Sequence, residues 1–273
     1  MLLKIFPQTS YRYDQPIRLG LFQLRLHPKT GRGQEVRSWS TRIEGGTKEV
    51  TFMDQFDNQV DLVSAHAHAD EVVVTGEGEV EVTDSGGIFG DHRGNIPLWL
   101  YTRETEATRP GSAIRQLAEA FSAEWQESSP DSGDITLLHA LSAQVLSCMS
   151  YQPGTTDTTT CAEDALAAGE GVCQDHAHVF LAASRCLGFP ARYVSGYLES
   201  GDNGSEQAGH AWAEVHVDGL GWVGFDVSNG ISPDDRYVRV ATGLDCQDAA
   251  PVRGMRLGDA AETMTVSLQV TQQ

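Results

Sequence analysis

The spacing of apolar and polar positions follows two patterns along the chain, which meet near residue 105. In the first part, short runs rich in β-branched and aromatic residues are separated by Gly, Asp, Asn and Pro, and the clearest runs cover residues 19–26, 59–65 and 71–82. Glutamates alternate with small or apolar residues through the last of these runs, which is the two-residue period of a strand with one solvated face. Residues 1–105 are therefore predicted to form an antiparallel β domain.

After residue 105 the apolar residues recur at helical spacing, which predicts helices over residues 113–125 and 135–149. The apolar positions that define the second helix are Ile135, Leu138, Leu141 and Val145. A third helix is expected to begin with Thr160 as its N-cap, because Glu163 three positions later would complete a capping box, and to end at Gly169. We expect residues 106–273 to form a second domain.

A fourth helix is predicted between two glycines. Gly171 precedes Cys173, the following stretch is rich in alanine, and Gly188 with Pro190 ends the helix. Cys173 is thereby placed at the helix N-terminus, where unpaired N–H groups and the positive end of the helix dipole stabilise a thiolate. The thiolate is the nucleophilic form of cysteine, and the same N–H groups can hold an oxyanion.

A hairpin is predicted over residues 210–227, with an Asp-Gly turn at residues 218 and 219. Facing residues of an antiparallel pair have a constant index sum, so a hairpin centred on residue 218 pairs His210 with Asp226. Alternation then places Trp212 and Trp222 on the same face as this pair. The residues predicted on the opposite face are Val215, Val217, Val223 and Phe225.

A thiolate at a helix end, an imidazole on a strand and a carboxylate beside that imidazole form a nucleophile, a base and an orienting group. In this interpretation His210 removes the Cys173 proton and later protonates the leaving amine, while Asp226 fixes the tautomer of the imidazole and favours its charged form. The acyl group would pass through a thioester on Cys173.

Four segments carry a family resemblance: GVCQDHAH (171–178), PARYVSGYL (190–198), GHAWAEV (209–215) and GWVGFDVSNG (221–230). Together they closely resemble the bacterial transglutaminase-like family of cysteine peptidases, and residues 25–28 and 54–60 resemble that family's β-rich leading domain. The resemblance implies an α+β fold with a papain-like core, in which helices pack on an antiparallel sheet, and it implies Cys173, His210 and Asp226 as the catalytic triad.

The chain departs from the family pattern at several positions beside the triad. His176 stands where an aromatic residue is usual, Gly209 replaces a serine, and residues 226–229 read Asp-Val-Ser-Asn in place of Asp-Pro-Thr-Asn. None of these changes removes a triad member.

Several side chains near the triad are candidates for the cleft. The backbone N–H of Cys173 is the first candidate for holding an oxyanion, with Gln174 or Tyr151 as the second donor. Trp212 and Trp222 are expected either to cover the triad or to pack in the core. The other candidate cleft residues are Arg192 and Tyr193. The polar loop 201–209, immediately before His210, is expected to border or cover the cleft.

Metal and disulfide chemistry are not expected. His176 and His178 are two positions apart on a helix, point in different directions and are assigned structural roles. His66 and His68 could share a strand face, but an exposed strand edge accounts for them. Five cysteines form an odd set without CxxC spacing, which argues against a disulfide framework or zinc ribbon. No cofactor and no metal are predicted.

The net charge of the chain restricts the kinds of partner that it is expected to bind. Asp and Glu outnumber Lys and Arg by 38 to 19, giving a formal charge of −19 that would repel nucleic acids and anionic lipid surfaces. No stretch approaches the length of a signal-peptide core or of a membrane span. A cytoplasmic protein with a peptide, protein or amide-containing substrate is expected, and the sequence does not specify its oligomeric state.

The predicted function is thiol-dependent hydrolysis of a peptide or carboxamide bond through Cys173. Three alternatives remain at this stage: transfer of the acyl group to an amine, as in a transglutaminase, a binding module that keeps the fold without catalysis, and a zinc enzyme. The first differs only in whether water or an amine attacks the thioester.

Overall fold

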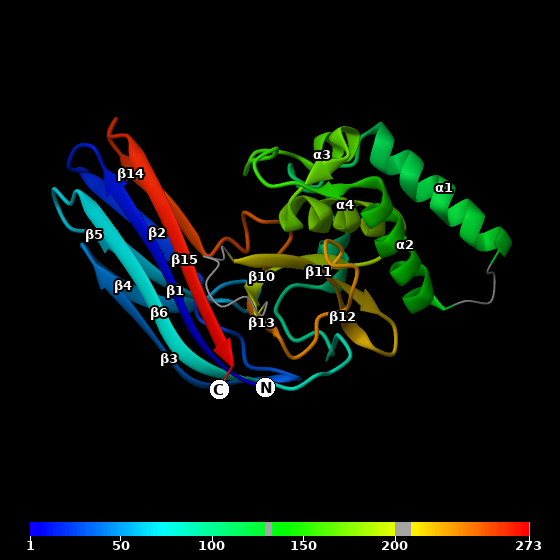
Figure 1. The fold of residues 1–273 in the computed structure, drawn as a ribbon, viewed down its shortest axis with the longest axis horizontal. Coiled ribbons are helices and arrows are strands. Elements are labelled where there is room, and N and C mark those ends of the chain that lie inside the picture. Colours follow the sequence, from blue (N-terminus) through cyan, green and yellow to red (C-terminus); the bar gives the residue numbers. More distant parts are fainter. Residues whose placement is uncertain (129–132, 200–208, 273) are drawn as a thin grey trace.

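The computed structural model describes residues 1–128, 133–199 and 209–272. It has two parts that lie side by side, one built of strands and one of strands and helices (Figure 1). Among the described residues, no helix combines the length and apolar character needed to cross a membrane.

The β part consists of two four-stranded antiparallel sheets. The first has the order β15-β1-β6-β3, with bounds Glu262–Gln272, Leu2–Tyr13, Glu71–Val82 and Gln34–Glu44. The second has the order β14-β2-β5-β4, with bounds Val252–Leu257, Leu19–Leu24, Gln59–Ala65 and Gly46–Met53. Their inner faces share one core that includes Tyr11, Phe22, Val63 and Val72. The predicted alternation is seen in β6, where every second residue is buried.

The sequence-based division at residue 105 placed the segments of β14 and β15 in the second domain. They pair instead with β2 and β1 of the first part. In the opposite direction, β7 (Ile88–Gly90) pairs with β12 (Gly221–Phe225) of the second part. Alternation identifies a strand but carries no information about its partner, because pairing depends on how distant segments meet.

The second part is a five-stranded sheet covered by helices on one face. Its order is β13-β10-β11-β12-β7, and the bounds of the strands not yet given are Tyr237–Gly243 for β13, Ala191–Leu198 for β10 and His210–Val217 for β11. The helices are α1 (Ser112–Ser128), α2 (Asp134–Cys148), α3 (Ala162–Ala168) and α4 (Cys173–Cys186), with a short 3-10 helix η1 at Leu98–Thr102. Two short strands, β8 (Ser150–Tyr151) and β9 (Glu170–Gly171), pair in parallel just before α4. The predicted α+β class is confirmed.

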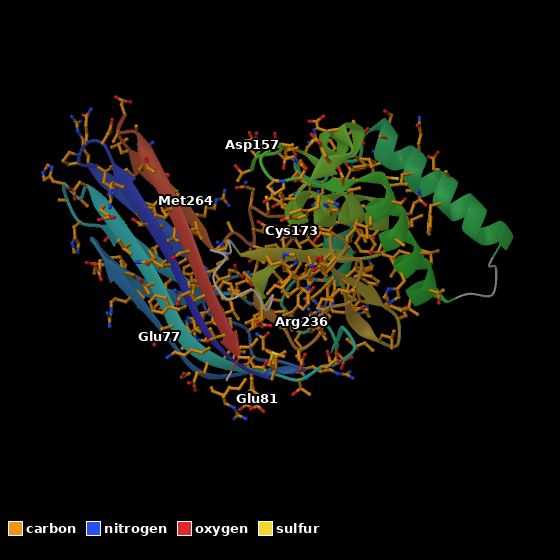
Figure 2. The ribbon with its side chains drawn as sticks, in the orientation of Figure 1. Glu77, Glu81, Asp157, Cys173, Arg236 and Met264 are labelled. Atoms are coloured by element: carbon orange, nitrogen blue, oxygen red, sulfur yellow. The ribbon has the colours of Figure 1, made fainter. Side chains whose placement is uncertain are left out.

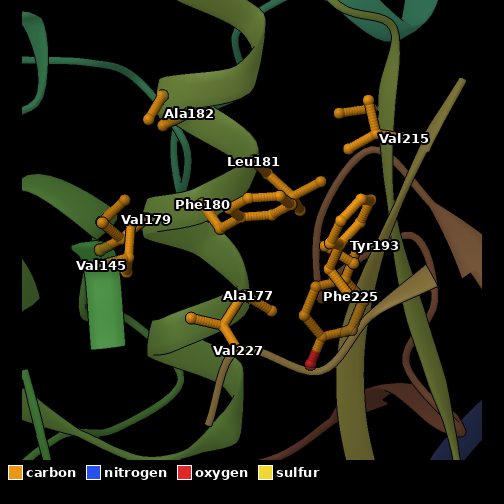
Figure 3. Close-up of a cluster of buried hydrophobic side chains, with 14 of the residues drawn as sticks. Val145, Ala177, Val179, Phe180, Leu181, Ala182, Tyr193, Val215, Phe225 and Val227 are labelled. Atoms are coloured by element: carbon orange, nitrogen blue, oxygen red, sulfur yellow. The ribbon is translucent and has the colours of Figure 1, made fainter. Parts of the chain in front are cut away.

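Helix α4 forms the centre of this part. Its side chains Phe180 and Leu181 pack toward Tyr193, Val215 and Phe225 of the sheet (Figure 3). The opposite face of the sheet packs on the first sheet of the β part, in a cluster that includes Leu3, Val80, Tyr197, Val238 and Leu268. The sheet that carries the candidate site is therefore held between helices on one side and the β part on the other.

The predicted N-cap of α3 is wrong: the observed N-cap lies one residue away from Thr160, and the expected capping box does not form. Cys161 occupies the N-cap, and Glu163 does not complete a capping box. The Glu163 carboxylate instead accepts the backbone N–H groups of Gly111, Ala113 and Ile114 at the start of α1. A carboxylate can cap whichever helix terminus lies within reach, and here the neighbouring helix presents more unpaired donors. Gly169 does end α3, in the left-handed conformation expected of it.

The hairpin register differs from the prediction by two positions. Val217 pairs with Gly221 and Ala213 pairs with Phe225, which centres the hairpin on Gly219. The turn contains three residues, because Gly219 and Gly221 both have positive φ and allow a longer loop than an Asp-Gly turn centred on 218. A shift of two preserves the faces: Val215, Val217, Val223 and Phe225 join the helix-side core, whereas Trp212 and Trp222 lie in clusters on the other side.

The two parts are also joined by buried polar contacts. Asn58 donates from Nδ2 to the Thr242 carbonyl at 2.8 Å and accepts the Thr242 N–H at 2.9 Å. Lys29 also lies at this junction, because its backbone N–H donates to the Arg239 carbonyl of β13 at 3.0 Å, and its ammonium donates to the carbonyls of Phe56 and Asp57. Burial, followed by the charges of nearby arginines, lowers the pKa of Lys29 to about 7. A titratable cation is thus built into the junction.

Candidate active site

Cys173 is the first residue of α4 and is partly exposed, on the side of the second part that faces the β part (Figure 2). The helix start is fixed by Asp175, whose Oδ2 accepts the Val172 N–H at 2.8 Å and the Thr156 hydroxyl at 2.7 Å. Gly171 is needed here, because a Cβ at that position would lie 2.6 Å from the Cβ of Asp175. The local sequence therefore holds the thiol at the helix N-terminus, where the dipole favours a thiolate.

His210 and Asp226 meet at the end of the hairpin. His210 begins β11, Asp226 directly follows β12, and His210 Nε2 lies 2.6 Å from Asp226 Oδ2. In the observed register they are diagonal neighbours on one face, a separation that side chains of this length can span. Asp226 is fully buried, whereas 14% of the His210 side chain is exposed. A buried carboxylate therefore faces an imidazole that solvent can reach.

The Asp226 carboxylate is surrounded by donors. Oδ2 also accepts Nδ2 of Asn229 at 2.7 Å and the hydroxyl of Tyr237 at 2.7 Å. Oδ1 accepts the Ser228 hydroxyl at 2.8 Å and the Asn229 N–H at 3.3 Å. A tight turn brings Ser228 and Asn229 to the carboxylate, because the backbones of Asp226 and Ile231 exchange two hydrogen bonds around it. The carboxylate is thereby held in one orientation.

The electrostatics of the site follow from these contacts. Burial alone would lower the pKa of His210, but hydrogen bonds with Asp226 and Cys173 raise it to about 10. Burial would raise the pKa of Asp226, but the bond and charge of His210, followed by the Tyr237 hydroxyl, hold it below its ordinary value. Because Nε2 faces Asp226, Nδ1 is the ring nitrogen left to meet the Cys173 thiol. The surroundings of His210 therefore favour a charged imidazolium beside an ionised Asp226.

Comparison with known proteins places this geometry in a family. Residues 119–227 match the family described as the transglutaminase-like superfamily, and residues 3–81 match the bacterial transglutaminase-like N-terminal region. Residues 119–227 therefore belong to the transglutaminase-like superfamily. The first match spans Cys173, His210 and Asp226, and the second covers most of the strands of the β part.

Similar proteins extend over both parts of this transglutaminase-like chain. An uncharacterized protein of Mycobacterium leprae is 26% identical over 276 residues, with 98% of each chain covered. An uncharacterized protein of Mycobacterium bovis is 26% identical over 288 residues, covering 92% of this chain and 86% of its own. The crystal structure of a "Putative Cysteine Protease" from Cytophaga hutchinsonii superposes with a TM-score of 0.74 at 20% identity, covering 100% of this chain and 91% of that one. That likeness shows the fold.

The candidate cleft residues of this transglutaminase-like site divide into two groups. Tyr151 is 54% exposed on β8, and the nearby charges of Cys173 and Asp226 add to burial in raising its pKa. Trp212 is buried and stacks on the His210 ring, with centroids 6.3 Å apart. Gln174 is partly exposed in the first turn of α4. These three lie at or beside the triad.

The remaining candidates lie away from the cleft surface. Tyr193 is buried against His178, with ring centroids 5.1 Å apart. Arg192 is buried in an ion pair with Glu214 and stacks on Trp222 at 3.9 Å. The expectation that Trp222 covers the triad is therefore wrong, since it packs with Tyr101 in a separate cluster. Of the predicted loop 201–209, residues 201–208 lie outside the described residues.

The histidine pairs have structural surroundings. His176 is fully buried, with Nδ1 2.9 Å from the Val172 carbonyl and Nε2 3.4 Å from the Met149 carbonyl. His178 accepts the Cys246 N–H, and burial lowers its pKa to about 4. His66 and His68 lie in a turn after β5, so they do not share a strand face as expected. Within the described ranges, no three His, Cys, Asp or Glu side chains are grouped as metal ligands.

The sequence analysis missed one residue that contacts the triad. Tyr237 is 3% exposed, lies eleven positions after Asp226 and reaches it from β13. The only local signal was the Ser-Asn pair after Asp226, which is typical of a turn whose side chains bond back to the preceding carboxylate. Nothing in the spacing of Tyr237 indicates this contact.

Proposed function

We propose that this protein is a thiol-dependent hydrolase that cleaves a peptide or carboxamide bond through Cys173. The observation that carries the proposal is the 2.6 Å contact between His210 and Asp226, beside a cysteine at a helix N-terminus that helps to raise the pKa of His210. Nucleophilic catalysis by cysteine requires a thiolate, a proton-transfer group and a fixed orientation of that group. All three requirements correspond to named side chains here.

The reaction would have two halves. The Cys173 thiolate attacks the carbonyl carbon, a C–S bond forms, and the C–N bond breaks as the His210 imidazolium gives its proton to the leaving amine. Water then gives a proton to His210 and attacks the thioester, so that a C–O bond forms and the C–S bond breaks. The products are an amine, a carboxylic acid and the restored thiolate–imidazolium pair. Asp226 keeps the ring in the tautomer that both halves need.

The oxyanion of each tetrahedral intermediate needs donors close to Cys173. The first N–H groups of a helix have no acceptor within the helix, so the Cys173 N–H is available for this purpose. Gln174 and Tyr151 are the side chains placed to add a second donor. Replacing Tyr151 by Phe and Gln174 by Ala separately would assign that donor, because removal of the true donor lowers kcat more than it raises KM.

The first experiment tests the activated thiol without needing a known substrate. Iodoacetamide should label Cys173 selectively below pH 7, and His210→Ala should abolish this selectivity because the thiolate loses its imidazolium partner. The exposed Cys148 and Cys186 serve as internal controls for an unactivated thiol. Equal labelling of all cysteines in the wild type would instead support a binding module without catalysis.

The second experiment identifies the acyl acceptor. A library of peptide amides, including glutamine-containing donors, is incubated with wild type and Cys173→Ala in the presence of a labelled primary amine. Release of free acid by the wild type alone supports hydrolysis. Incorporation of the amine would contradict hydrolysis as the main reaction and favour transfer, since both reactions proceed from the same thioester.

A further inference from the structure

Tyr237 lies outside the hairpin, and its hydroxyl donates a hydrogen bond to the Asp226 carboxylate. Tyr237 begins β13, two strands away from β11 in the sheet, and its hydroxyl donates to Asp226 Oδ2 at 2.7 Å. Asn229 Nδ2 donates to the same Oδ2 at 2.7 Å and lies 3.5 Å from the Tyr237 oxygen. His210 provides the third contact to Oδ2. A single carboxylate oxygen thus receives donors from three directions.

The ring of Tyr237 also contacts the imidazole. Its centroid lies 5.9 Å from that of His210 and 5.5 Å from that of Trp212, and the latter pair of rings is nearly perpendicular. Since Trp212 stacks on His210, the two aromatic rings limit the tilt of the imidazole while the hydroxyl limits rotation of the carboxylate. Both effects therefore restrict the orientation in which the His210 ring faces Cys173.

We propose that Tyr237 is a positioning residue of the active site, which fixes the Asp226 carboxylate through its hydroxyl and thereby sets the orientation and charge of His210 toward Cys173. The inference rests on the proposed function, because it assigns Tyr237 a task in the same thiolate–imidazolium pair. Tyr237 is not assigned contact with the substrate. Its effect passes through Asp226 and His210, so it should change the rate of chemistry and the pH dependence and leave KM unaltered.

Tyr237→Phe removes one oxygen atom and keeps the aromatic ring. Asp226 then loses a donor that stabilises its ionised form, which in turn favours the imidazolium beside Cys173. The acid limb of the alkylation profile, meaning the pH range in which the rate falls toward low pH, should therefore move to higher pH. A hydrogen bond to a charged group corresponds to a shift of about 1 to 2 pH units. The probe is iodoacetamide, and the measured quantity is the second-order rate of Cys173 alkylation between pH 4 and 9.

Tyr197→Phe is the matched control. Tyr197 is also buried, at 4% exposure, and its hydroxyl has no hydrogen-bond partner among the described residues. Its substitution should leave the alkylation profile superimposed on that of the wild type. As a second variant, 3-fluorotyrosine at position 237 keeps the hydroxyl and makes it a stronger donor, so the acid limb should move to lower pH. A merely structural role would not produce opposite shifts from Phe and fluorotyrosine.

The outcomes separate this inference from the proposed function. If wild-type Cys173 reacts below pH 7 and the two Tyr237 variants shift the acid limb in opposite directions, the positioning role is supported. If the Tyr237→Phe profile coincides with the wild type, or only its thermal midpoint changes, the inference is overturned while the proposed function stands. If wild-type Cys173 shows no enhanced reactivity, the proposed function itself fails before Tyr237 is tested.

Discussion

Asp226 is the residue on which the candidate site depends most strongly. It is fully buried, and four side chains and one backbone N–H donate to its two oxygens. Burial of a carboxylate is costly unless such donors compensate for lost water. The donors therefore keep a negative charge in a dry position, where its effect on His210 is not weakened by solvent.

Asp226→Asn should retain the shape of the site and remove this charge. The pKa of His210 should fall from about 10, because the charge and bond that raise it are lost. We expect turnover to fall roughly 10²- to 10⁴-fold, since the imidazole is then free to adopt the wrong tautomer. Steady-state kinetics on the best amide from the library would measure this. Asp157→Asn, at an exposed position in the loop between β8 and α3, is the control. An equal loss of turnover in both variants would contradict the role assigned to Asp226.

Which residues could be predicted depended on how local their signals are. The position of Cys173 follows from Gly171 and the helix that begins beside it, all within a few residues. The proximity of His210 and Asp226 follows from alternation, which survived a two-position error in register because side chains repeat every second residue. Tyr237 lacked any such signal, because its contact depends on how β13 is placed relative to β12.

At the scale of elements, the helices are joined through Glu163. Its carboxylate lies on α3 and accepts three backbone N–H groups at the start of α1, at 2.6 to 3.0 Å. Gly111 must be a glycine for this contact, because a Cβ there would lie 2.4 Å from the Glu163 carboxyl carbon. Helix α3 is short, and this contact fixes it between α1 and α4.

Glu163→Ala should destabilise the protein by about 1 to 3 kcal/mol, because three N–H groups lose a charged acceptor. Glu104→Ala is the matched control, since Glu104 forms an exposed pair with Arg115 at 3.4 Å and should change stability by less than about 1 kcal/mol. Urea unfolding at pH 7 would measure both. Similar values for the two variants would show that the cross-helix cap contributes little.

At the scale of the whole molecule, the first sheet of the β part serves two cores. One end of its inner face packs on the second sheet, and the other end packs on β10 and β13 of the transglutaminase-like part. Leu268 of β15 is 5% exposed in this second core, whereas Met264 of the same strand is 57% exposed. The support beneath the sheet that carries the candidate site therefore comes from the β part.

Leu268→Ala should destabilise the protein by about 2 to 4 kcal/mol through loss of apolar contacts and the cavity left behind. Met264→Ala should change stability by less than about 0.5 kcal/mol because its side chain is exposed. Thermal unfolding, followed alongside iodoacetamide labelling of Cys173, would show whether the two parts melt together. Separate transitions would contradict a shared core.

The pH dependence of stability also belongs to the whole molecule. His210 has its pKa raised from 6.5 to about 10, so its stabilising contribution is complete below pH 6.5 and is lost toward pH 10. Lys29 has its pKa lowered from 10.5 to about 7, so its contribution is complete above pH 10.5 and is lost as the pH falls to 7. Between pH 7 and 9 the two residues change the free energy of unfolding in opposite directions, so that it should depend little on pH.

Single substitutions would separate the two contributions. With His210→Gln the free energy of unfolding should rise between pH 7 and 9, and with Lys29→Met it should fall, by up to about 1.4 kcal/mol per pH unit in each case. Urea unfolding at intervals across this range is the measurement. A flat curve for both variants would contradict the assigned shifts.

The pairing of β1 with β15 has a consequence for synthesis. Leu3 lies opposite Gln272, so β1 pairs with a strand, β15, that is translated about 250 residues after it. At roughly 5 to 20 residues per second, the edge of β1 waits about ten seconds to a minute for that partner. Until then one edge of β1 has no partner strand, and the core beneath β10 and β13 lacks Leu268. The part of the chain that carries the candidate site thus leaves the ribosome before the strand that completes its support.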